Sequence, residues 1–291
     1  MRAPVAGAAS LAVRSLLDGP RHPARLIAVF PSAVYLEVRV AAEPRVVAVV
    51  SADAVRLPNS IVVAANSRLQ PFNGIHDGDD ALIGDGCIDI VAPNGMPRLR
   101  VRVRRWWDPS PVLGPISAAR LAHGAVTLEA AMDSGRFGLS GHPGPELLAD
   151  RCAAGDLAHA VDAAERIVGL GPGLTPSGDD VLAGLLLALR LLGGAVPGGG
   201  TAVWLADWLG AAVTAHADTR TTSLAASLLH CAAHGEAAAE VAAVLHGIAG
   251  QEPVRPAVRR LLNAGHTSGA DLAWGLLAGC RAALSLSQAP A

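Results

Sequence analysis

Lysine is absent from this chain of 291 residues, because all 23 of its basic residues are arginine. Without a lysine, the chain cannot form a lysine Schiff base, anchor pyridoxal phosphate or supply the lysine of a P-loop. Charge is also scarce, since charged residues make up 16% of the sequence and hydrophobic residues 51%. The formal net charge is −2, and no basic stripe indicates nucleic acid as a partner. The composition is that of a globular protein.

Cysteine is rare, and the four cysteines lie far apart without a CxxC pair, at Cys87, Cys152, Cys231 and Cys280. This spacing argues against a structural zinc site or a disulfide framework and favours reduced thiols in a cytoplasmic protein. The N-terminus lacks a basic start followed by a sustained apolar core, so we expect no signal peptide. The longest apolar stretch, residues 181–196, contains Arg190 and is shorter than a membrane span of about 20 residues, so we expect no membrane helix.

The first part of the chain has the pattern of strands, after a short helix expected at about Pro4 to Leu17. Residues 98–104 alternate strictly between arginine and apolar residues, which predicts a strand with one solvent-facing side. Several short antiparallel strands predict a small barrel or sandwich. The expected strands, which are β-branched or alternating and separated by turn residues, are Leu26–Phe30, Val34–Val40, Arg45–Val50, Ser60–Ala64, Ala81–Val91 and Leu99–Trp107.

The second part is rich in alanine and leucine at helical spacing. The two prolines within residues 108–111 favour a boundary there, and residues 193–200 predict a flexible glycine-rich connector. We therefore predict an α+β fold, with a β-rich barrel or sandwich-like domain at residues 1–110 and an all-helical domain at residues 111–291. The expected helices lie near residues 115–133, 144–153, 155–167, 177–192, 201–216, 221–234, 236–248, 254–264 and 269–286.

A glycine-rich loop opens directly onto one of these helices at residues 169–180, Gly-Leu-Gly-Pro-Gly-Leu-Thr-Pro-Ser-Gly-Asp-Asp. Thr175 or Ser177 can cap the helix, Pro176 suits its first turn, and Asp179 and Asp180 complement its positive end. A well-capped helix after a tight loop is one interpretation. The number of glycines and hydroxyls favours another, a site where first-turn N–H groups bind an anion. Its candidate ligand-binding residues are Gly171, Gly173, Thr175, Ser177 and Gly178.

A second segment, residues 265–271, repeats this pattern as Gly-His-Thr-Ser-Gly-Ala-Asp. Residues 177–186 align without gaps onto residues 268–277, with serine, glycine, the second acidic position, a later glycine and two leucines in common. Two such helix starts could face one cavity and bind one anion, although coincidence in a chain rich in alanine, leucine and glycine is the alternative. The candidates here are Thr267, Ser268, Gly269 and Asp271, with His266 as a general base.

A third candidate helix start contains Arg220, Thr221 and Thr222. The forked guanidinium of arginine suits a carboxylate or phosphate, and the neighbouring hydroxyls can add hydrogen bonds. Transcarbamoylases of the aspartate and ornithine type hold carbamoyl phosphate with a similar Ser-Thr-Arg-Thr helix start. A solvated arginine on a helix is the alternative.

Together, the three segments resemble the signatures of the oxamate carbamoyltransferase small-subunit family of allantoin catabolism. Residues 71–73, Pro-Phe-Asn, also resemble that family's N-terminal element, which adds Asn73 to the candidates. The resemblance is specific at residues 169–186 and loose before residue 70. It implies a multisubunit enzyme that interconverts oxalurate plus phosphate with oxamate plus carbamoyl phosphate.

We therefore predict a carbamoyltransferase-type enzyme or subunit whose site lies where the three helix starts converge. One alternative is a nucleotide-using phosphotransferase in which Asp179 and Asp180 hold Mg²⁺; another is a non-catalytic anion-binding subunit. No cofactor beyond a possible Mg²⁺ is indicated. We expect a small anionic substrate and a homo-oligomer or other enzyme subunits as partners. The expected roles are phosphate binding by the glycine-rich loop and Arg220, polarisation of the carbamoyl oxygen by Thr175, Ser177, Thr267 and Ser268, and orientation of the amine by Asp179, Asp180 or His266.

Overall fold

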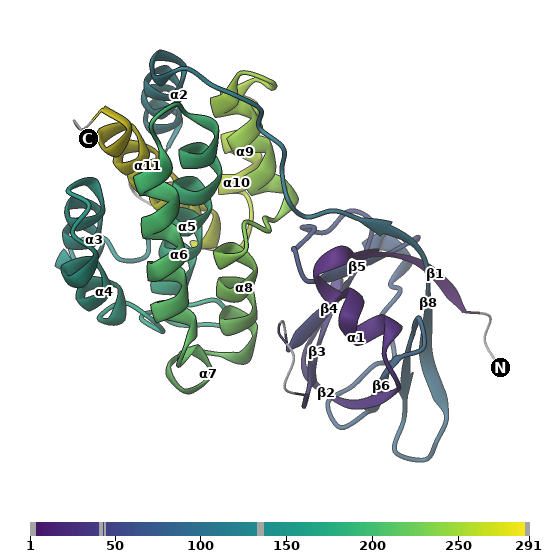
Figure 1. Cartoon of the computed structure of the whole chain (residues 1–291). Helices are drawn as coiled ribbons and strands as arrows, with labels where there is room; N and C mark the ends of the chain where they lie inside the picture. The colour runs from purple at the N-terminus through teal and green to yellow at the C-terminus, as the bar shows by residue number, and fades with distance from the viewer. Residues whose placement is uncertain (1–3, 41–42, 44, 133–136, 289–291) are drawn as a thin grey trace. The chain divides into compact units, whose positions relative to one another are not determined.

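The computed structural model describes residues 4–40, 43, 45–132 and 137–288 (Figure 1). The chain divides into two compact units, Met1–Pro109 and Ser110–Ala291. The first is an eight-stranded β-barrel and the second is helical, which confirms the predicted α+β fold class. That residues 1–110 and 111–291 are separate domains stays a prediction.

The strands of the first unit close into a barrel in the order β1-β5-β4-β3-β2-β6-β7-β8. Neighbouring strands are antiparallel, as expected, except in the parallel pairs β1–β8 and β4–β5, so the barrel is mixed. Valine and isoleucine side chains such as Val47, Ile61 and Val101 fill the interior. The strands are β1 Val5–Ser10, β2 His22–Phe30, β3 Ala33–Val38, β4 Val46–Val50, β5 Ser60–Val63, β6 Asp80–Gly84, β7 Cys87–Val91 and β8 Pro97–Trp107.

The opening segment differs from the prediction. Instead of a helix over Pro4 to Leu17, the chain forms β1, a 3-10 helix at Leu11–Val13 and the short helix α1 at Arg14–Asp18. The small residues of β1 permit close packing inside the barrel, since a Cβ built on Gly7 would lie 2.8 Å from Ile61 Cγ2 and 2.9 Å from Val101 Cγ1. Strand pairing to β5 and β8 therefore overrides the helical preference of an alanine-rich segment.

The predicted strand Ala81–Val91 is in fact a hairpin of β6 and β7. Asp85 and Gly86 form its two-residue turn, with φ of 52° and 68°. Positive φ at both positions is the geometry that an Asp-Gly pair favours in tight hairpins.

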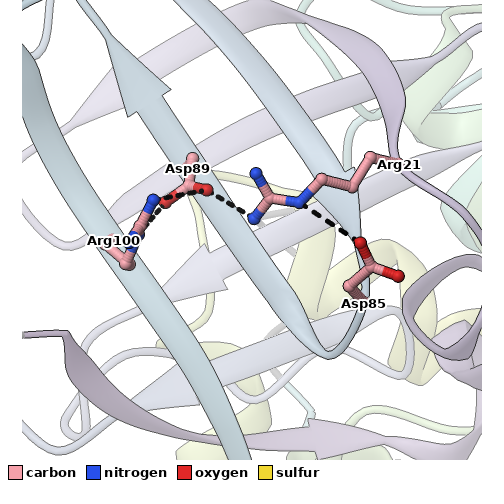
Figure 2. Close-up of polar contacts among 4 residues, drawn as sticks. All are labelled: Arg21, Asp85, Asp89 and Arg100. Atoms are coloured by element: carbon pink, nitrogen blue, oxygen red, sulfur yellow. Dashed lines mark hydrogen bonds and ion pairs between the residues drawn. The ribbon is translucent and has the colours of Figure 1, made fainter.

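A buried carboxylate connects three parts of the barrel surface (Figure 2). Asp89 of β7, which is 6% exposed, accepts hydrogen bonds from Arg100 of β8 and from Arg21, whose Nη2 is 2.5 Å from its Oδ2. Arg21 also lies 3.6 Å from the exposed Asp85. Burial raises the pKa of the Asp89 carboxyl, but the hydrogen bonds and charges of Arg100 and Arg21 outweigh it, so this pKa lies below its ordinary value.

The helical unit has a counterpart for each expected helix, with an additional single turn, α7, that the sequence did not predict. The end of the expected helix 115–133, at residue 133, lies outside the described residues. The predicted connector 193–200 is shorter than expected, because α5 continues to Ala195 and α6 begins at Gly200, which leaves residues 196–199 as the connecting turn. The helices are α2 Ala118–Ala131, α3 Pro143–Ala153, α4 Leu157–Glu165, α5 Ser177–Ala195, α6 Gly200–Thr214, α7 Ala217–Arg220, α8 Ser223–Ala233, α9 Ala239–Ala249, α10 Val254–Leu262 and α11 Ser268–Gln288.

Helix α5 is the core of this unit, since every residue from 177 to 189 is buried. A helix that is apolar on all sides is stable only when other helices surround it, and α5 packs against α6, α8, α9 and α11. The four cysteines are buried free thiols. In the described parts of the chain, no helix has the length and apolar character needed to cross a membrane.

Candidate functional site

The two glycine-rich helix starts lie side by side. Thr175 Oγ1, before α5, is 3.0 Å from Ser268 Oγ, the first residue of α11, and Ser177 Oγ is 3.5 Å from Thr267 Oγ1. The two helices run parallel from this point, because Gly184 packs against Gly275 and, further along, Ala188 packs against Gly279. Two positive helix ends therefore meet at one place.

The same backbone hydrogen bonds recur at both starts. Gly178 donates to the carbonyl of Leu170 over 2.9 Å, and Gly269 donates to the carbonyl of Ala264 over 3.0 Å. Neither position tolerates a side chain, since a Cβ would lie 1.8 Å from the carbonyl oxygen of Ile167 in one case and 1.9 Å from that of Leu261 in the other. These two glycines are therefore required by packing, whether or not a ligand binds.

The capping of α5 differs from the prediction. Pro176 is the N-cap residue, without a side-chain cap, and Ser177 is the first helical residue. The Thr175 hydroxyl bonds across to α11 instead of capping its own helix. The N–H groups of Ser177 and Ser268 have no acceptor within the described part of the chain, so one backbone donor remains at each helix start.

Asp179 of α5 forms hydrogen bonds with both the glycine-rich loop and the third helix start. Its carboxyl is 2% exposed and accepts hydrogen bonds from the Gly169 N–H, at 3.0 Å, and from the Thr221 hydroxyl. Burial raises the pKa of this carboxyl, and the two hydrogen bonds offset part of the rise. Asp179 therefore organises the site through backbone and hydroxyl contacts.

The other two residues of the third helix start are held differently. The Thr222 hydroxyl caps α8 by accepting from Ala225 N at 3.1 Å and donates to the carbonyl of Leu174 at 2.5 Å. Arg220 turns to the end of α4, where its guanidinium donates to the carbonyl of Glu165 and lies 3.8 Å from the Glu165 carboxylate. The structure thus joins Thr221 and Thr222 to the glycine-rich loop, while the arginine head lies against α4.

Asp271 holds a further loop, which contains Phe137 and Gly138, against the paired starts. It is fully buried, and its Oδ1 accepts from the Gly138 N–H at 2.8 Å. A Cβ on Gly138 would lie 2.1 Å from Ser177 Oγ and 3.1 Å from Asp271 Oδ2, so this loop lies directly against the paired starts. Next to it, Phe137 stacks on Trp274 of α11, with ring centroids 5.3 Å apart. Sequence reasoning missed Phe137 and Gly138, because no local motif marks a segment whose partners lie more than 100 residues away.

Two carboxyl oxygens in this cluster have no hydrogen-bond partner, Oδ2 of Asp180 and Oδ2 of Asp271. Burial raises the pKa of Asp180 well above its ordinary value; the Ser268 hydroxyl opposes the rise, and the charges of Asp271 and Asp179 add to it. Burial also raises the pKa of Asp271, with the Gly138 N–H and the hydroxyls of Ser177 and Thr267 acting against it. Asp180 is therefore favoured in its neutral form.

The remaining candidates have different surroundings. Gly171 lies against Ser177, with a built Cβ 2.8 Å from Ser177 N, whereas Gly173 is exposed and a Cβ built on it would meet nothing within 4 Å. His266 is exposed in the turn before α11. Asn73 belongs to the barrel unit, where its amide is 3.4 Å from Gln70 Oε1. Their roles as ligand-binding or catalytic residues stay predictions.

The donor set does not indicate a metal site. Throughout the described ranges, no three histidine, cysteine, aspartate or glutamate side chains are grouped so that they could hold an ion. The arrangement instead offers hydroxyls, two free N–H groups and two unpaired carboxyl oxygens, which suit a small polar ligand with both donors and acceptors.

The comparison with protein families agrees with these motifs. No solved structure matches this chain. Residues 167–280, which run from the glycine-rich loop through most of α11, match a family model described as oxamate carbamoyltransferase subunit AllH. The resemblance drawn from the helix-start motifs is thereby confirmed, and this segment belongs to the oxamate carbamoyltransferase subunit AllH family.

Proposed function

We propose that the chain is a subunit of a carbamoyl-transferring enzyme and that the paired starts of α5 and α11 bind its small anionic substrate. The observation that carries this proposal is the contact of Thr175 with Ser268, which holds two parallel helix N-termini together. Each N-terminus contributes about half a positive charge, so the pair favours a ligand with more than one negative charge. Carbamoyl phosphate and phosphate meet that requirement.

The reaction proposed is the exchange of oxalurate and phosphate with oxamate and carbamoyl phosphate. In the direction from oxalurate, a phosphate oxygen attacks the carbamoyl carbon, the bond from that carbon to the oxamate nitrogen breaks, and the nitrogen takes up a proton. The hydroxyls of Thr175, Ser177, Thr267 and Ser268 would polarise the carbamoyl oxygen. The proposed proton donor is Asp180, because burial raises its pKa and so favours its protonated form.

Arg220 is proposed to bind the phosphate at the edge of this site. Its guanidinium has five N–H donors, and the Glu165 carbonyl accepts from one of its nitrogens, so donors remain for a ligand. The backbone of Arg220 is fixed against the glycine-rich loop, since a Cβ on Gly169 would lie 2.1 Å from the carbonyl oxygen of Arg220. The side chain therefore starts close to the loop from which the other donors come.

Partner subunits are part of the proposal. Trp204 and Trp208, one turn apart on α6, are 46% and 57% exposed. Exposed tryptophans are frequent centres of protein interfaces. We expect the chain to be a homo-oligomer or to join other enzyme subunits. A monomer by light scattering after size exclusion, together with no partner recovered from the native cell, would contradict this.

The activity test uses oxalurate and phosphate with the full chain, alone and after capture with its native partners. We expect carbamoyl phosphate to form, and Ser268→Ala to lower the rate at least about tenfold by removing one polarising donor. Ser285→Ala, an exposed serine on the same helix, is the matched control. Activity only with partners would assign the chain a binding role, and its absence under both conditions would contradict the proposal.

A further inference from the structure

We infer that the unpaired oxygens of Asp271 and Asp180 recognise the primary amide group of the substrate, and so distinguish an amide from a carboxylate. This inference rests on the proposed function, because it names the substrate chemistry of the same paired helix starts. The observation behind it is that both Oδ2 atoms are buried without a hydrogen-bond partner, in residues that are 0% and 6% exposed.

Buried acceptors without donors are rare, because each costs free energy that a hydrogen bond would recover. The hydroxyls of Thr175, Ser177, Thr267 and Ser268 lie close enough to lower the pKa of these carboxyls, but neither Oδ2 has a hydrogen-bond partner. A ligand group with two donors would satisfy both oxygens. A carbamoyl or oxamate NH₂ carries two N–H bonds on a planar fork and leaves its carbonyl oxygen for the neighbouring hydroxyls. A protonated Asp180 keeps one carbonyl-type oxygen as an acceptor, so its raised pKa is compatible with this role.

A cavity lies next to this turn, on the face of α11 that carries Ala270 and Trp274, although neither Asp271 nor Asp180 lines it. This cavity of about 310 Å³ is lined by Ala270 and Trp274 of α11 and by Phe137 and Leu139. These residues flank Asp271 along the helix and Gly138 along the loop that covers it. A molecule the size of oxamate is small compared with such a cavity.

Substitution of Asp271 by asparagine tests the inference, because the structure indicates which of the two side-chain positions the new NH₂ group will take. Its Oδ1 is fixed as an acceptor by the Gly138 N–H at 2.8 Å. In Asp271→Asn the amide oxygen must keep that contact, so the NH₂ group takes the place of Oδ2. The unpaired acceptor becomes a donor, which suits a carboxylate oxygen and repels an amide NH₂.

The experiment compares the affinities of the full chain for oxamate, for oxalate, which carries an oxygen in place of the NH₂, and for N,N-dimethyloxamate, which lacks the N–H donors. We expect the wild type to favour oxamate over both. In Asp271→Asn the ratio of oxamate to oxalate affinity should fall at least about tenfold, as expected for one exchanged hydrogen bond. Asp180→Asn, which resembles the neutral acid, should keep the preference for oxamate. The exposed Asp162→Asn of α4 is the control.

Each outcome decides the inference. An equal loss of affinity for oxamate and oxalate in Asp271→Asn would indicate a purely structural carboxyl and overturn it. If that variant does not fold by circular dichroism, equal wild-type affinity for oxamate and N,N-dimethyloxamate overturns it, and a clear preference for oxamate supports it. Binding of carbamoyl phosphate without any preference for oxamate overturns the inference and leaves the proposed function standing. Binding of none of these ligands overturns both.

Discussion

Gly184 of α5 lies against Gly275 of α11, such that a Cβ built on Gly184 would be 3.2 Å from the carbonyl carbon of Gly275 and 2.3 Å from the carbonyl oxygen of Leu272. The contact is reciprocal, because a Cβ on Gly275 would be 2.1 Å from the carbonyl oxygen of Val181. Gly184 and Gly275, like Val181 and Leu272, occupy equivalent positions in the repeated sequence. This crossing holds the two helix starts together.

The close crossing predicts that Gly184→Ala destabilises the helical unit. Overpacking against backbone costs about 1–3 kcal/mol, which exceeds the gain of about 1 kcal/mol in helix propensity. Chemical denaturation of the full chain measures the effect. Gly194→Ala, in the same helix but with its nearest neighbour at 3.9 Å, should be neutral or stabilising. Equal stability of the two variants would contradict the crossing.

The buried Asp180 predicts a pH-dependent stability of opposite sign to that of an ordinary surface aspartate. Because its pKa is raised in the folded chain, the neutral form is favoured, and stability is lost as pH rises through the folded pKa. Asp180→Asn should remove this loss, so its free energy of unfolding should exceed that of the wild type at pH 8 and approach it in mild acid. Asp162→Asn should leave the profile unchanged. A constant difference at all pH values would contradict the raised pKa.

In the barrel unit, Asp89→Ala should lower stability by about 1–3 kcal/mol, because it leaves the guanidinium groups of Arg21 and Arg100 without their partner. The wild-type contribution of Asp89 is present above its ordinary pKa of 3.8 and is lost as pH falls through its lower folded pKa. Hydrogen exchange of the β7 amides measures both effects. Asp85 is more exposed, so Asp85→Ala should have little effect on stability. Equal effects of the two variants would contradict the claim that the contacts of Asp89 with Arg21 and Arg100 stabilise the barrel.

Arg220→Ala tests the proposed phosphate contact. A hydrogen bond to a charged group contributes about 1.5–3 kcal/mol, so phosphate affinity in calorimetric titration should fall by about one to two orders of magnitude. Arg166→Ala, an exposed arginine at the end of α4, serves as the control. Unchanged phosphate affinity in a folded Arg220→Ala chain would mean that this side chain does not bind phosphate and only contacts the end of α4.

Local patterns predicted much of this molecule. The alternation of arginine with apolar residues predicted β8, and the apolar run after Asp180 predicted the helix α5. The alignment of residues 177–186 onto 268–277 predicted that the two helix starts adjoin, and Thr175 and Ser268 do so. These features are readable because the periodicity or the repeat lies within one stretch of sequence.

Features set by distant contacts were not predictable. β1 is alanine-rich and forms a strand because β5 and β8 pair with it. The sequence predicts Thr175 as a helix cap, yet its hydroxyl forms a hydrogen bond with Ser268, which is 93 residues away in the sequence. Gly138 contacts the paired starts through Asp271, 133 residues away, and no local motif marks it.

The central claim is that the paired starts of α5 and α11 bind the substrate. Hydrogen exchange of the full chain with and without carbamoyl phosphate tests this most directly, because amides that gain a bound ligand exchange more slowly. We predict slower exchange in residues 169–180 and 265–272 together, with β7 unchanged. Bound carbamoyl phosphate that leaves the exchange of both segments unaltered, or protects only another part of the chain, would contradict the account.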